Sequence, residues 1–196
     1  MSVLVLFSGG VDSTVLLTEA LLQGQLGLAL WYRYQHPAAA AEYRARIAIE
    51  NHFTQQGLPV VSAELSPPLF GLDATDLGAG VVGPRVVPVR NQVFVSIAVA
   101  MAAARVFSEV WIGAQAQDAS AYPDCRPGWI EAMDKLALEW GVRVRAPLIR
   151  MSRAQVRTKG QSMGAPLSLC SSCYQPIDGL PCGGCSSCLQ DSGGGE

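Results

Sequence analysis

The chain has 196 residues, of which 49% are hydrophobic and 15% charged, and its formal net charge is −2. That composition excludes a disordered chain, and the length suits one domain with a single core and a small appendage. The charge lacks the basic excess of a nucleic-acid binder, and no stretch reaches the roughly 18 apolar residues of a membrane span, so a small-molecule substrate is favoured.

Strands and helices alternate along the chain. A continuous apolar run over 3–7 predicts a strand covered on both faces, and helical spacing over 13–22 follows until Gly24 stops it. Pro127 suits the first turn of a helix and Ser152 suits an N-cap. The pattern predicts further strands over 27–32, 59–63, 109–113 and 142–144, and helices over 38–56, 91–107, 127–140 and 152–161.

This alternation predicts an α/β fold, a doubly wound parallel sheet of five strands. In such sheets ligands bind beyond the carboxyl ends of the strands. Three loops follow predicted strands, at 8–13, 32–36 and 113–126, and we expect them to meet at one site. The Pro- and Gly-rich stretch 66–85 lacks periodicity, and we expect a long loop there that acts as a lid.

The glycine-rich loop Ser8-Gly9-Gly10-Val11-Asp12-Ser13 lies between the first strand and the first helix. Successive glycines let backbone N–H groups point inward, and with a helix N-terminus behind them they bind anionic oxygens. Ser8 and Ser13 add hydroxyl donors, whereas Asp12 suits a role through Mg²⁺ or helix capping. No Lys follows the glycines, so this is not a Walker A loop. The loop predicts a phosphate site.

Six cysteines lie in a chain whose first apolar run, 3–7, has no preceding positive charge and so is not a signal peptide. We therefore expect a cytoplasmic protein, whose cysteines are metal ligands or catalytic groups and not disulfides. The spacing of the last three allows a tight knuckle, and four thiolates make a closed structural Zn²⁺ site. The ligand set that we predict is Cys173, Cys182, Cys185 and Cys188, with Cys170 as a spare thiol.

Two other uses of these cysteines stay open. Four thiolates also suit an iron–sulfur cluster. A redox CxxC pair is disfavoured because the segment has the composition of a loop and does not open a helix after a strand. The expected organisation is a phosphate-loop domain over 1–165, a zinc-binding segment over 166–190 and a disordered tail over 191–196.

The phosphate loop resembles that of the N-type ATP pyrophosphatases, which cleave ATP to AMP and pyrophosphate while they adenylate a substrate oxygen. Further segments resemble one group among them, the 7-cyano-7-deazaguanine synthase (QueC) family. Val87–Phe94 looks like its VPxRNxxF segment and Tyr122–Pro127 reproduces YPDCRP. Cys173-Tyr174 followed by 182–188 looks like its zinc-binding end, and Gln35-His36 echoes a Gln-Arg-His segment. The resemblance spans 3–188 and implies an adenine nucleotide α-hydrolase-like fold.

By this resemblance, ATP, ammonia and 7-carboxy-7-deazaguanine give 7-cyano-7-deazaguanine, a queuosine precursor. The substrate carboxylate attacks the α-phosphate, pyrophosphate leaves, and ammonia displaces AMP to form an amide. A second adenylation and loss of AMP then give the nitrile. The implied cofactors are ATP, Mg²⁺ and a structural Zn²⁺, and the family implies a homodimer.

The site residues follow from the matched motifs. Residues 8–13 and Asn91 hold the nucleotide, and Arg90 neutralises the phosphates together with Mg²⁺ near Asp12. Asp124 suits the guanine-like edge of the substrate, because a carboxylate accepts two adjacent N–H donors. The other substrate contacts that we expect are His36, Asp118, Cys125 and Arg126, with Asp12, Arg90, Asp124 and Arg126 as the catalytic set.

Plainer roles for these residues stay open. Asp124 and the flanking prolines suit a turn that caps a helix, and Arg90-Asn91 suits a plain helix start. Asp118 suits the surface as well as the site. A structural role fits His36, and packing or substrate contact fits Cys125 better than nucleophilic attack, since adenylation already activates the carbonyl.

Four departures from the family pattern widen the choice of reactions. Arg153 stands where the family carries Lys, and Arg does not act as a titrating acid or base. Ser171 replaces a tryptophan, no Arg follows Cys188 closely, and the usual C-terminal helix is missing. An alternative is therefore a diverged enzyme that transfers the activated acyl group to an amine on a protein or nucleic acid. A tRNA-modifying relative needs a basic groove, and a non-catalytic zinc module would release no AMP.

Overall fold

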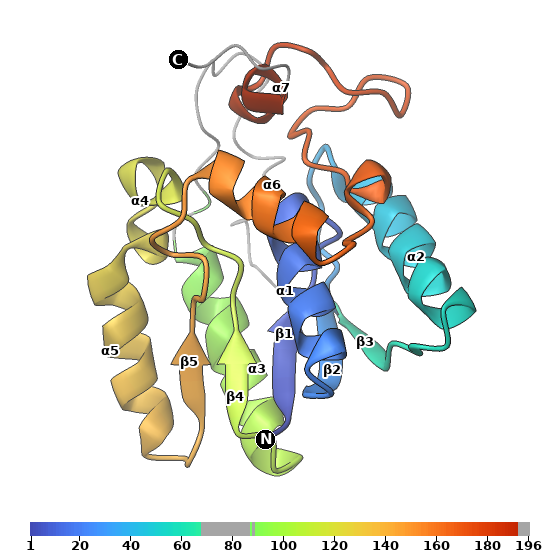
Figure 1. Cartoon of the computed structure of the whole chain (residues 1–196). Helices are drawn as coiled ribbons and strands as arrows, with labels where there is room; N and C mark the ends of the chain where they lie inside the picture. The colour runs from blue at the N-terminus through green and yellow to red at the C-terminus, as the bar shows by residue number, and fades with distance from the viewer. Residues whose placement is uncertain (68–86, 88, 192–196) are drawn as a thin grey trace.

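Five short strands form one parallel sheet in the order β3-β2-β1-β4-β5 (Figure 1). The computed structural model describes residues 1–67, 87 and 89–191. The predicted doubly wound parallel sheet of five strands is confirmed. The strands are β1 (Val3–Leu6), β2 (Leu26–Tyr32), β3 (Ser62–Leu65), β4 (Glu109–Trp111) and β5 (Arg143–Arg145).

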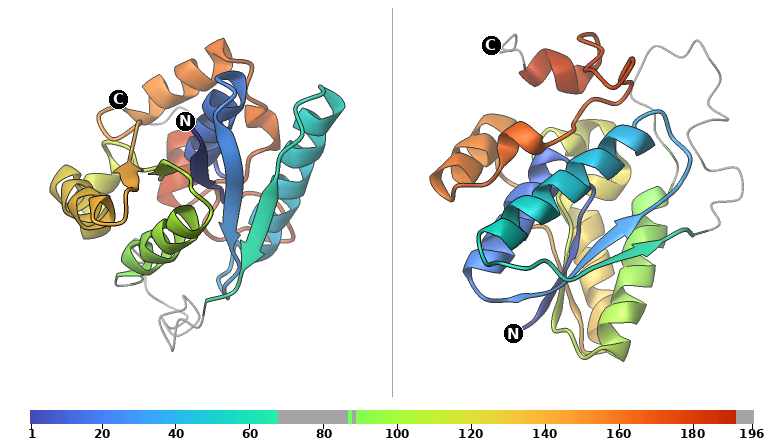
Figure 2. Two further views of the ribbon diagram at one scale, coloured as in Figure 1. Left: turned by 90° about the horizontal axis from the view of Figure 1, so that it is seen from below. Right: turned by 90° about the vertical axis from the view of Figure 1, so that its right-hand side faces the viewer.

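Helices cover both faces of the sheet (Figure 2). One face carries α1 (Val11–Leu22), α2 (Ala39–Gln55) and α6 (Arg153–Ser162), and the other carries α3 (Arg90–Ala104) and α5 (Pro127–Leu138). The central strand β1 is buried on both sides, with Val3, Leu4 and Val5 fully inaccessible. Its continuous apolar run is the direct cause, because each face of a strand in such a sheet meets a helical layer.

Several helix ends match their local chemistry. Pro127 occupies the first turn of α5, as expected, and Ser152 caps α6 in a capping box with Gln155. The α1 helix ends at Leu22, two residues before Gly24, whose φ of +63° favours glycine. These ends were readable from sequence because capping is a local interaction.

Other boundaries differ from the prediction. We expected the third strand over 59–63, but β3 begins three residues later, at Ser62. Pro59 has no N–H for a ladder, and the edge strand pairs with only one neighbour, so the register with Ala29–Tyr32 decides where it begins. Four short helices were not predicted, namely α4 (Asp118–Ala121), η1 (Pro123–Cys125), η2 (Leu167–Leu169) and α7 (Ser186–Asp191).

The last helix corrects two expectations about the C-terminal segment. Cys188 lies in α7, so the second CxxC step does open a short helix. The tail expected to be disordered from 191 on begins with a helical residue, and its remainder lies outside the described residues. The lid expected over 66–85 also lies outside them, except for Ser66 and Pro67. Within the described ranges, no helix has the length and apolarity to cross a membrane.

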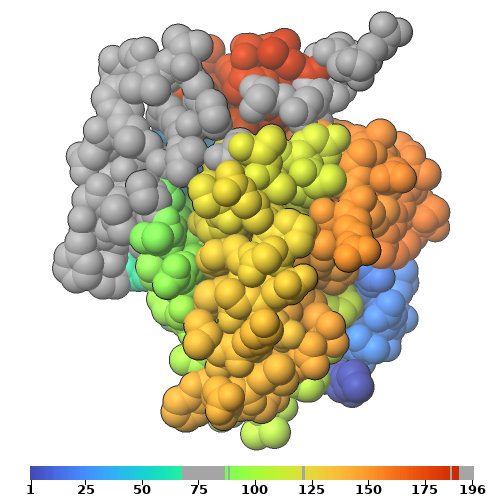
Figure 3. Space-filling model, turned by 90° about the vertical axis from the view of Figure 1, so that its left-hand side faces the viewer, coloured from blue at the N-terminus to red at the C-terminus, as the bar shows by residue number. Residues whose placement is uncertain are grey.

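One side of the molecule is formed by α5 and its neighbours. Figure 3 looks onto this side: α5 runs down the middle of the view beside the segment that contains α6, and α7 lies at the end of the molecule where the strands terminate. This side carries two exposed apolar side chains at the end of α5, Leu136 at 66% and Trp140 at 72% exposure. The functional groups described next lie elsewhere, at the carboxyl ends of the strands.

The order of the strands locates the ligand site. The chain runs from β1 outward to β2 and β3, then returns to place β4 on the other side of β1. The order therefore reverses between β1 and β4, and open α/β sheets bind ligands in the crevice at that point. The loops after both strands, at 8–13 and 112–118, face this crevice.

Candidate active site

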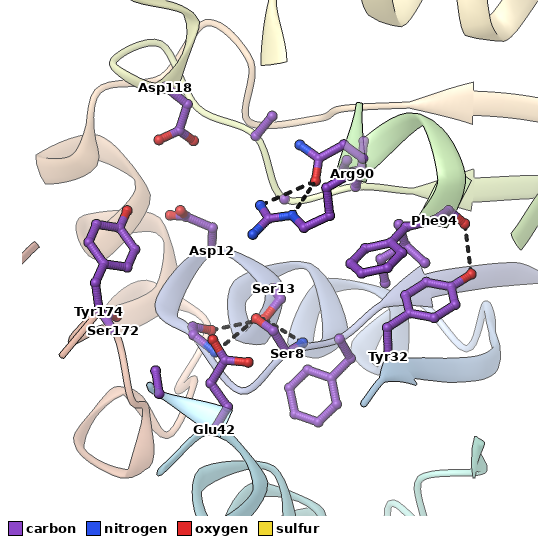
Figure 4. A pocket seen from close by; sticks show the side chains of 18 of the residues that line it. Ser8, Asp12, Ser13, Tyr32, Glu42, Arg90, Phe94, Asp118, Ser172 and Tyr174 are labelled. Carbon is purple, nitrogen blue, oxygen red and sulfur yellow. Dashed lines mark hydrogen bonds between the residues drawn. The ribbon is translucent and has the colours of Figure 1, made fainter. Parts of the chain in front are cut away.

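A cleft of about 300 Å³ opens at the point where the strand order reverses. Figure 4 shows side chains from four parts of the chain that point into it: the phosphate loop, α2, α3 and the cysteine segment. The volume is at the lower end of that of small-molecule sites. The structure thus brings the three loops expected to meet at the strand ends into one site.

The phosphate loop is held by its own hydroxyl groups. The Ser8 N–H donates to Ser13 Oγ at 3.3 Å, and Ser13 Oγ donates to the Gly10 carbonyl at 3.1 Å. Thr14 Oγ1 also donates to Gly10 O, at 2.7 Å. Because α1 begins at Val11, the first backbone N–H groups of the helix have no carbonyl partner within the helix and are available to an anion.

Two glycines let the loop approach its neighbours closely. A Cβ at Gly9, where φ is +84°, would lie 3.0 Å from the Glu42 carbonyl oxygen and 3.0 Å from the Arg46 nitrogen of α2. A Cβ at Gly113, just beyond β4, would lie 3.1 Å from Ser13 N. The loop is therefore clamped between α2 and the end of β4, and any side chain at either glycine would push it out of place.

Two acidic side chains face the cleft from opposite sides, Asp12 from α1 and Asp118 from the start of α4 (Figure 4). Asp118 Oδ2 accepts a hydrogen bond from Gln115 N at 3.0 Å, and burial raises the pKa of its carboxyl. The positive charge of Arg153 lies close enough to Asp118 to lower its pKa, which partly opposes the effect of burial. Carboxylate oxygens of this kind suit a hard divalent cation such as Mg²⁺.

Arg90, the first residue of α3, is one of two cations that line the cleft, the other being Arg153. Its guanidinium donates to the Tyr34 hydroxyl at 2.9 Å and to Asn91 Oδ1 at 3.4 Å. Burial acts to lower the pKa of Arg90, but Tyr34, Glu42 and Asp124 outweigh burial and raise it. The side chain therefore keeps its charge where an anionic substrate would enter.

Asp124 and Cys125 meet the start of α3 and not the open cleft. Asp124 Oδ2 accepts a hydrogen bond from Asn91 N at 3.0 Å, so it caps the N-terminus of a distant helix. Asn91 Nδ2 donates to Cys125 Sγ at 3.4 Å, and burial raises the pKa of Cys125 to about 12, which keeps the thiol protonated. Cys125 lines the cleft, whereas Asp124 does not.

Arg126 is directed away from these groups. Its Nε donates to the Ala119 carbonyl at 3.1 Å in an exposed position, and it does not line the cleft. Of the predicted nucleotide and substrate residues, Gly9, Asp124 and Arg126 do not line the cleft, and the others do. Their predicted contacts with a substrate remain predictions.

His36 lines the cleft from the segment after β2. Its ring stacks on Tyr34 with centroids 4.4 Å apart, and its Nε2 lies 3.5 Å from Glu42 Oε2. Burial and, to a smaller extent, Arg90 lower the pKa of His36 to about 4, so the imidazole is neutral. Burial raises the pKa of Glu42 to about 7 although Arg90 opposes this.

The four predicted metal ligands form one cluster. The Sγ atoms of Cys173, Cys182, Cys185 and Cys188 all lie within 4.8 Å of one another, and tetrahedral zinc requires sulfur atoms roughly 3.8 Å apart. Backbone N–H groups donate to three of the sulfurs, as from Cys182 N to Cys173 Sγ at 3.2 Å. The residues present thus fit a four-thiolate metal, and Cys170 stays apart, donating to Thr14 Oγ1 at 3.3 Å.

The cysteine segment forms one wall of the cleft. Ser171, Ser172, Tyr174 and Ser187 line it. The segment is attached to the body by hydrogen bonds from Ser171 N to Gly9 O at 3.0 Å and from the Arg153 guanidinium to Ser187 Oγ at 2.8 Å. The position of Cys188 in α7 therefore does not imply a redox pair, because four sulfurs gather and not two.

Several cleft residues escaped the sequence prediction. Tyr34 and Glu42 flank the predicted His36, and the signal that could have found Glu42 is its place in the first turn of a helix that follows a strand end. Arg153 was noted only as a departure from the family pattern. The serines of the cysteine segment carried no signal, since nothing local indicates that the segment folds back over the phosphate loop.

The parallel sheet and the hydroxyl-lined phosphate loop define an ATP-dependent enzyme of the N-type pyrophosphatase class. The family model described as "Queuosine biosynthesis protein QueC" matches residues 2–194, and the chain belongs to that family.

Curated relatives named 7-cyano-7-deazaguanine synthase cover most of the chain. Those from Solidesulfovibrio magneticus and Syntrophus aciditrophicus are each 36% identical, over 94% of this chain and 87% and 88% of their own lengths. That from Kineococcus radiotolerans is also 36% identical, over 94% of this chain and 89% of its own length.

A solved structure supports the fold. It is the U34-tRNA thiolase NcsA from Methanococcus maripaludis with its 4Fe–4S cluster, with a TM-score of 0.54 at 14% identity. The match covers 91% of this chain and 62% of that protein. At this identity the likeness concerns the fold alone.

Proposed function

We propose that the cleft converts 7-carboxy-7-deazaguanine, ammonia and ATP to 7-cyano-7-deazaguanine, with release of AMP and pyrophosphate. The observation that carries the proposal is the match of the QueC family over residues 2–194 to a chain whose phosphate loop, half-buried Arg90 and cysteine segment line one cleft. The protein is an ATP-dependent enzyme of this family. Its curated relatives are named 7-cyano-7-deazaguanine synthase.

In the adenylation step, the substrate carboxylate attacks the α-phosphorus of ATP. The N–H groups of the loop and of the first turn of α1, with the hydroxyls of Ser8 and Ser13, hold the pyrophosphate that leaves. Arg90 neutralises charge that develops on the α-phosphate, because its guanidinium is a fixed cation within the cleft. Preorganisation by Tyr34 and Asn91 means that little of this cation must reorient during the reaction.

A divalent cation would strengthen the same step. Asp12 and Asp118 would hold Mg²⁺, which would supply charge neutralisation on the phosphates. Zn²⁺ in the cysteine cluster would be structural, since four thiolates leave no open coordination position. We prefer zinc to an iron–sulfur cluster because nothing in the proposed reaction transfers an electron.

Substrate recognition is assigned to the wall opposite the loop. His36, Asp118 and Cys125 line the cleft and are candidates for contacts with the deazaguanine ring. Asp124 supports this wall through its bond to Asn91, and its predicted contact with the substrate would require that bond to be exchanged. Arg126 would have to leave the Ala119 carbonyl to reach a carboxylate or phosphate.

The acyl-transfer alternative has no observation in its favour. Ammonia therefore remains the acceptor in this proposal, with a cytoplasmic location and a homodimer as further predictions. A protein or nucleic-acid acceptor would call for a docking surface beside the cleft, and the net charge of −2 offers no general attraction to nucleic acid.

Isotope transfer from the substrate tests the reaction directly. The protein is incubated with Mg-ATP, ammonium and 7-carboxy-7-deazaguanine whose carboxylate oxygens are both ¹⁸O. Each carboxylate oxygen leaves attached to phosphorus, so the proposal predicts two molecules of AMP per nitrile, each carrying one ¹⁸O atom. Mass spectrometry of AMP and of the deazaguanine product reads out both numbers.

Two results would contradict the proposal. Unlabelled AMP would mean that water, and not the substrate, attacks the nucleotide. Labelled AMP with a final amide, or with no ammonia-derived product, would show that the second adenylation does not occur. Omission of ammonium is the control, and it should leave adenylation detectable while no nitrile forms.

A further inference from the structure

Glu42 is the acidic group of the cleft that the sequence motifs do not include. It lies in the first turn of α2, and its side chain points into the cleft beside Ser8 and Ser13 (Figure 4). The side chain is 24% exposed, and as a lining residue it is accessible from the cleft. Its own carbonyl oxygen packs against Gly9, so the distance between α2 and the phosphate loop is fixed.

Charged and titratable groups face Glu42 from two other elements. Arg90 comes from α3, and Tyr34 and His36 come from the segment after β2. The guanidinium of Arg90 bonds to Tyr34, and Tyr34 stacks on His36. Glu42 therefore belongs to a compact polar cluster that also contains Arg90.

An anionic carboxylate is the wrong group to grip a phosphate. Beside the loop it would repel a triphosphate, so its presence calls for another purpose. Burial raises its pKa to about 7, which keeps both the acid and the carboxylate populated near neutral pH. A group in that state accepts and releases protons readily, whereas the thiol of Cys125 stays protonated and neutral His36 is a weak base.

The proposed reaction removes three protons from nitrogen, one when ammonia attacks and two when the amide becomes the nitrile. We propose that Glu42 is the general base that takes a proton from the attacking nitrogen of ammonia, and again from nitrogen when the adenylated amide becomes the nitrile. The inference rests on the proposed function and names a catalytic residue outside the family motifs quoted above.

The atoms balance in both steps. In the first, the C–N bond forms, the acyl C–O bond to AMP breaks with its electron pair on the phosphate oxygen, and Glu42 receives a proton from nitrogen. In the second, both N–H bonds of the amide break: one proton leaves to solvent when the amide oxygen attacks ATP, and the other passes to Glu42 as the C≡N bond is completed and the C–O bond breaks to release AMP. Glu42 returns each proton to solvent through the open side of the cleft, and no oxidant or reductant is consumed.

Glu42→Gln separates this role from adenylation. It keeps the size of the side chain and removes the basic oxygen. Exchange of labelled pyrophosphate into ATP, measured with 7-carboxy-7-deazaguanine but without ammonia, reports adenylation alone and should stay within about threefold of wild type. Nitrile formation with ammonia should fall by about 10²-fold or more, the usual contribution of a general base.

The pH profile gives a second readout that a structural role would not move. At constant free ammonia, nitrile formation by wild type should fall about tenfold per pH unit below about 7, because the carboxylate becomes protonated. Glu42→Gln should lack this limb. Glu50→Gln is the matched control, since Glu50 lies on the same helix, pairs with Arg46 at 2.9 Å and does not line the cleft.

The outcomes distinguish the inference from the proposed function. If Glu42→Gln forms nitrile at the wild-type rate, or if it loses pyrophosphate exchange and nitrile formation equally, Glu42 is not the base. If wild type itself forms no nitrile, the proposed function fails first. Attack by hydroxylamine depends less on a base than attack by ammonia. Replacing ammonia with hydroxylamine should therefore raise the rate of acyl transfer more in Glu42→Gln than in wild type, and an equal increase in both would also overturn the inference.

Discussion

The cleft has two walls that are ordered in different ways. The first consists of the phosphate loop, α2 and the start of α3, and it rests on a sheet whose central strand is buried on both faces. The second is the cysteine segment, 170–188, which has few buried apolar side chains and whose four sulfurs gather at one point. The first wall is stabilised by the hydrophobic core, whereas the second would be stabilised by a metal held by the four sulfurs.

The difference teaches which functions each wall can carry. The sheet-borne wall can hold charged groups, such as half-buried Arg90, because a large apolar core offsets their cost. The cysteine wall depends on its cluster and on a few bonds to the body, so its position depends on metal occupancy. We therefore expect the first wall to act on the phosphates and the second to cover the substrate.

The largest effect is expected from Asp12→Ala in the sheet-borne wall. Loss of the carboxylate should lower the rate of pyrophosphate exchange by more than about 10³-fold, because the Mg²⁺ that Asp12 would hold no longer neutralises charge on the phosphates. The melting temperature should stay near that of wild type, since the core is untouched. Asp12→Asn, which keeps the shape, should be equally inactive, and a variant of either kind with normal exchange would remove Asp12 from the mechanism.

Cys185→Ser tests the cysteine wall. Loss of one thiolate should release the metal and lower the melting temperature by about 10 °C or more, because metal binding contributes directly to the stability of such sites. Circular dichroism should show that the sheet persists below that temperature. Cys170→Ser is the matched control, since Cys170 lies outside the cluster, and equal metal content in both variants would contradict the ligand set.

Ser187→Ala tests the connection between the walls. The variant removes the acceptor of the 2.8 Å bond from Arg153, and bonds to charged groups contribute about 1.5–3 kcal/mol. Hydrogen exchange of the amides in α7 should quicken by about tenfold, while those in β1 should not change. Unchanged protection of α7 would mean that this contact does not hold the segment.

The smallest effect that we expect is a pH dependence of the stability, caused by the ionisation of Glu42 in the sheet-borne wall. Burial raises the pKa of Glu42 to about 7 in the folded protein, so its ionisation favours unfolding, and stability should fall as pH rises from about 4.5 to 7. Glu42→Gln removes this cost and should therefore melt at a higher temperature than wild type at pH 8. The two proteins should melt together near pH 5, and a constant difference would show that ionisation is not the cause.

Much of the fold was predictable because its signals are local. The buried first strand, the capped helix α6 and the phosphate loop each depend on neighbours within a few residues. The edge strand β3 was misplaced because its register depends on β2, thirty-odd residues earlier in the chain. The short helices at 118–121 and 186–191 were missed because so few turns carry no periodic signal.

Within the site, the sequence by itself determined the chemistry of the phosphate loop and the set of four sulfurs, since both are contained in short motifs. Only the tertiary structure decided that Asp124 caps α3, that the serines of 171–172 line the cleft, and that Glu42 joins His36 and Arg90. These facts depend on burial and on contacts between distant segments, and a side chain's pKa is set by such surroundings and not by its neighbours in sequence.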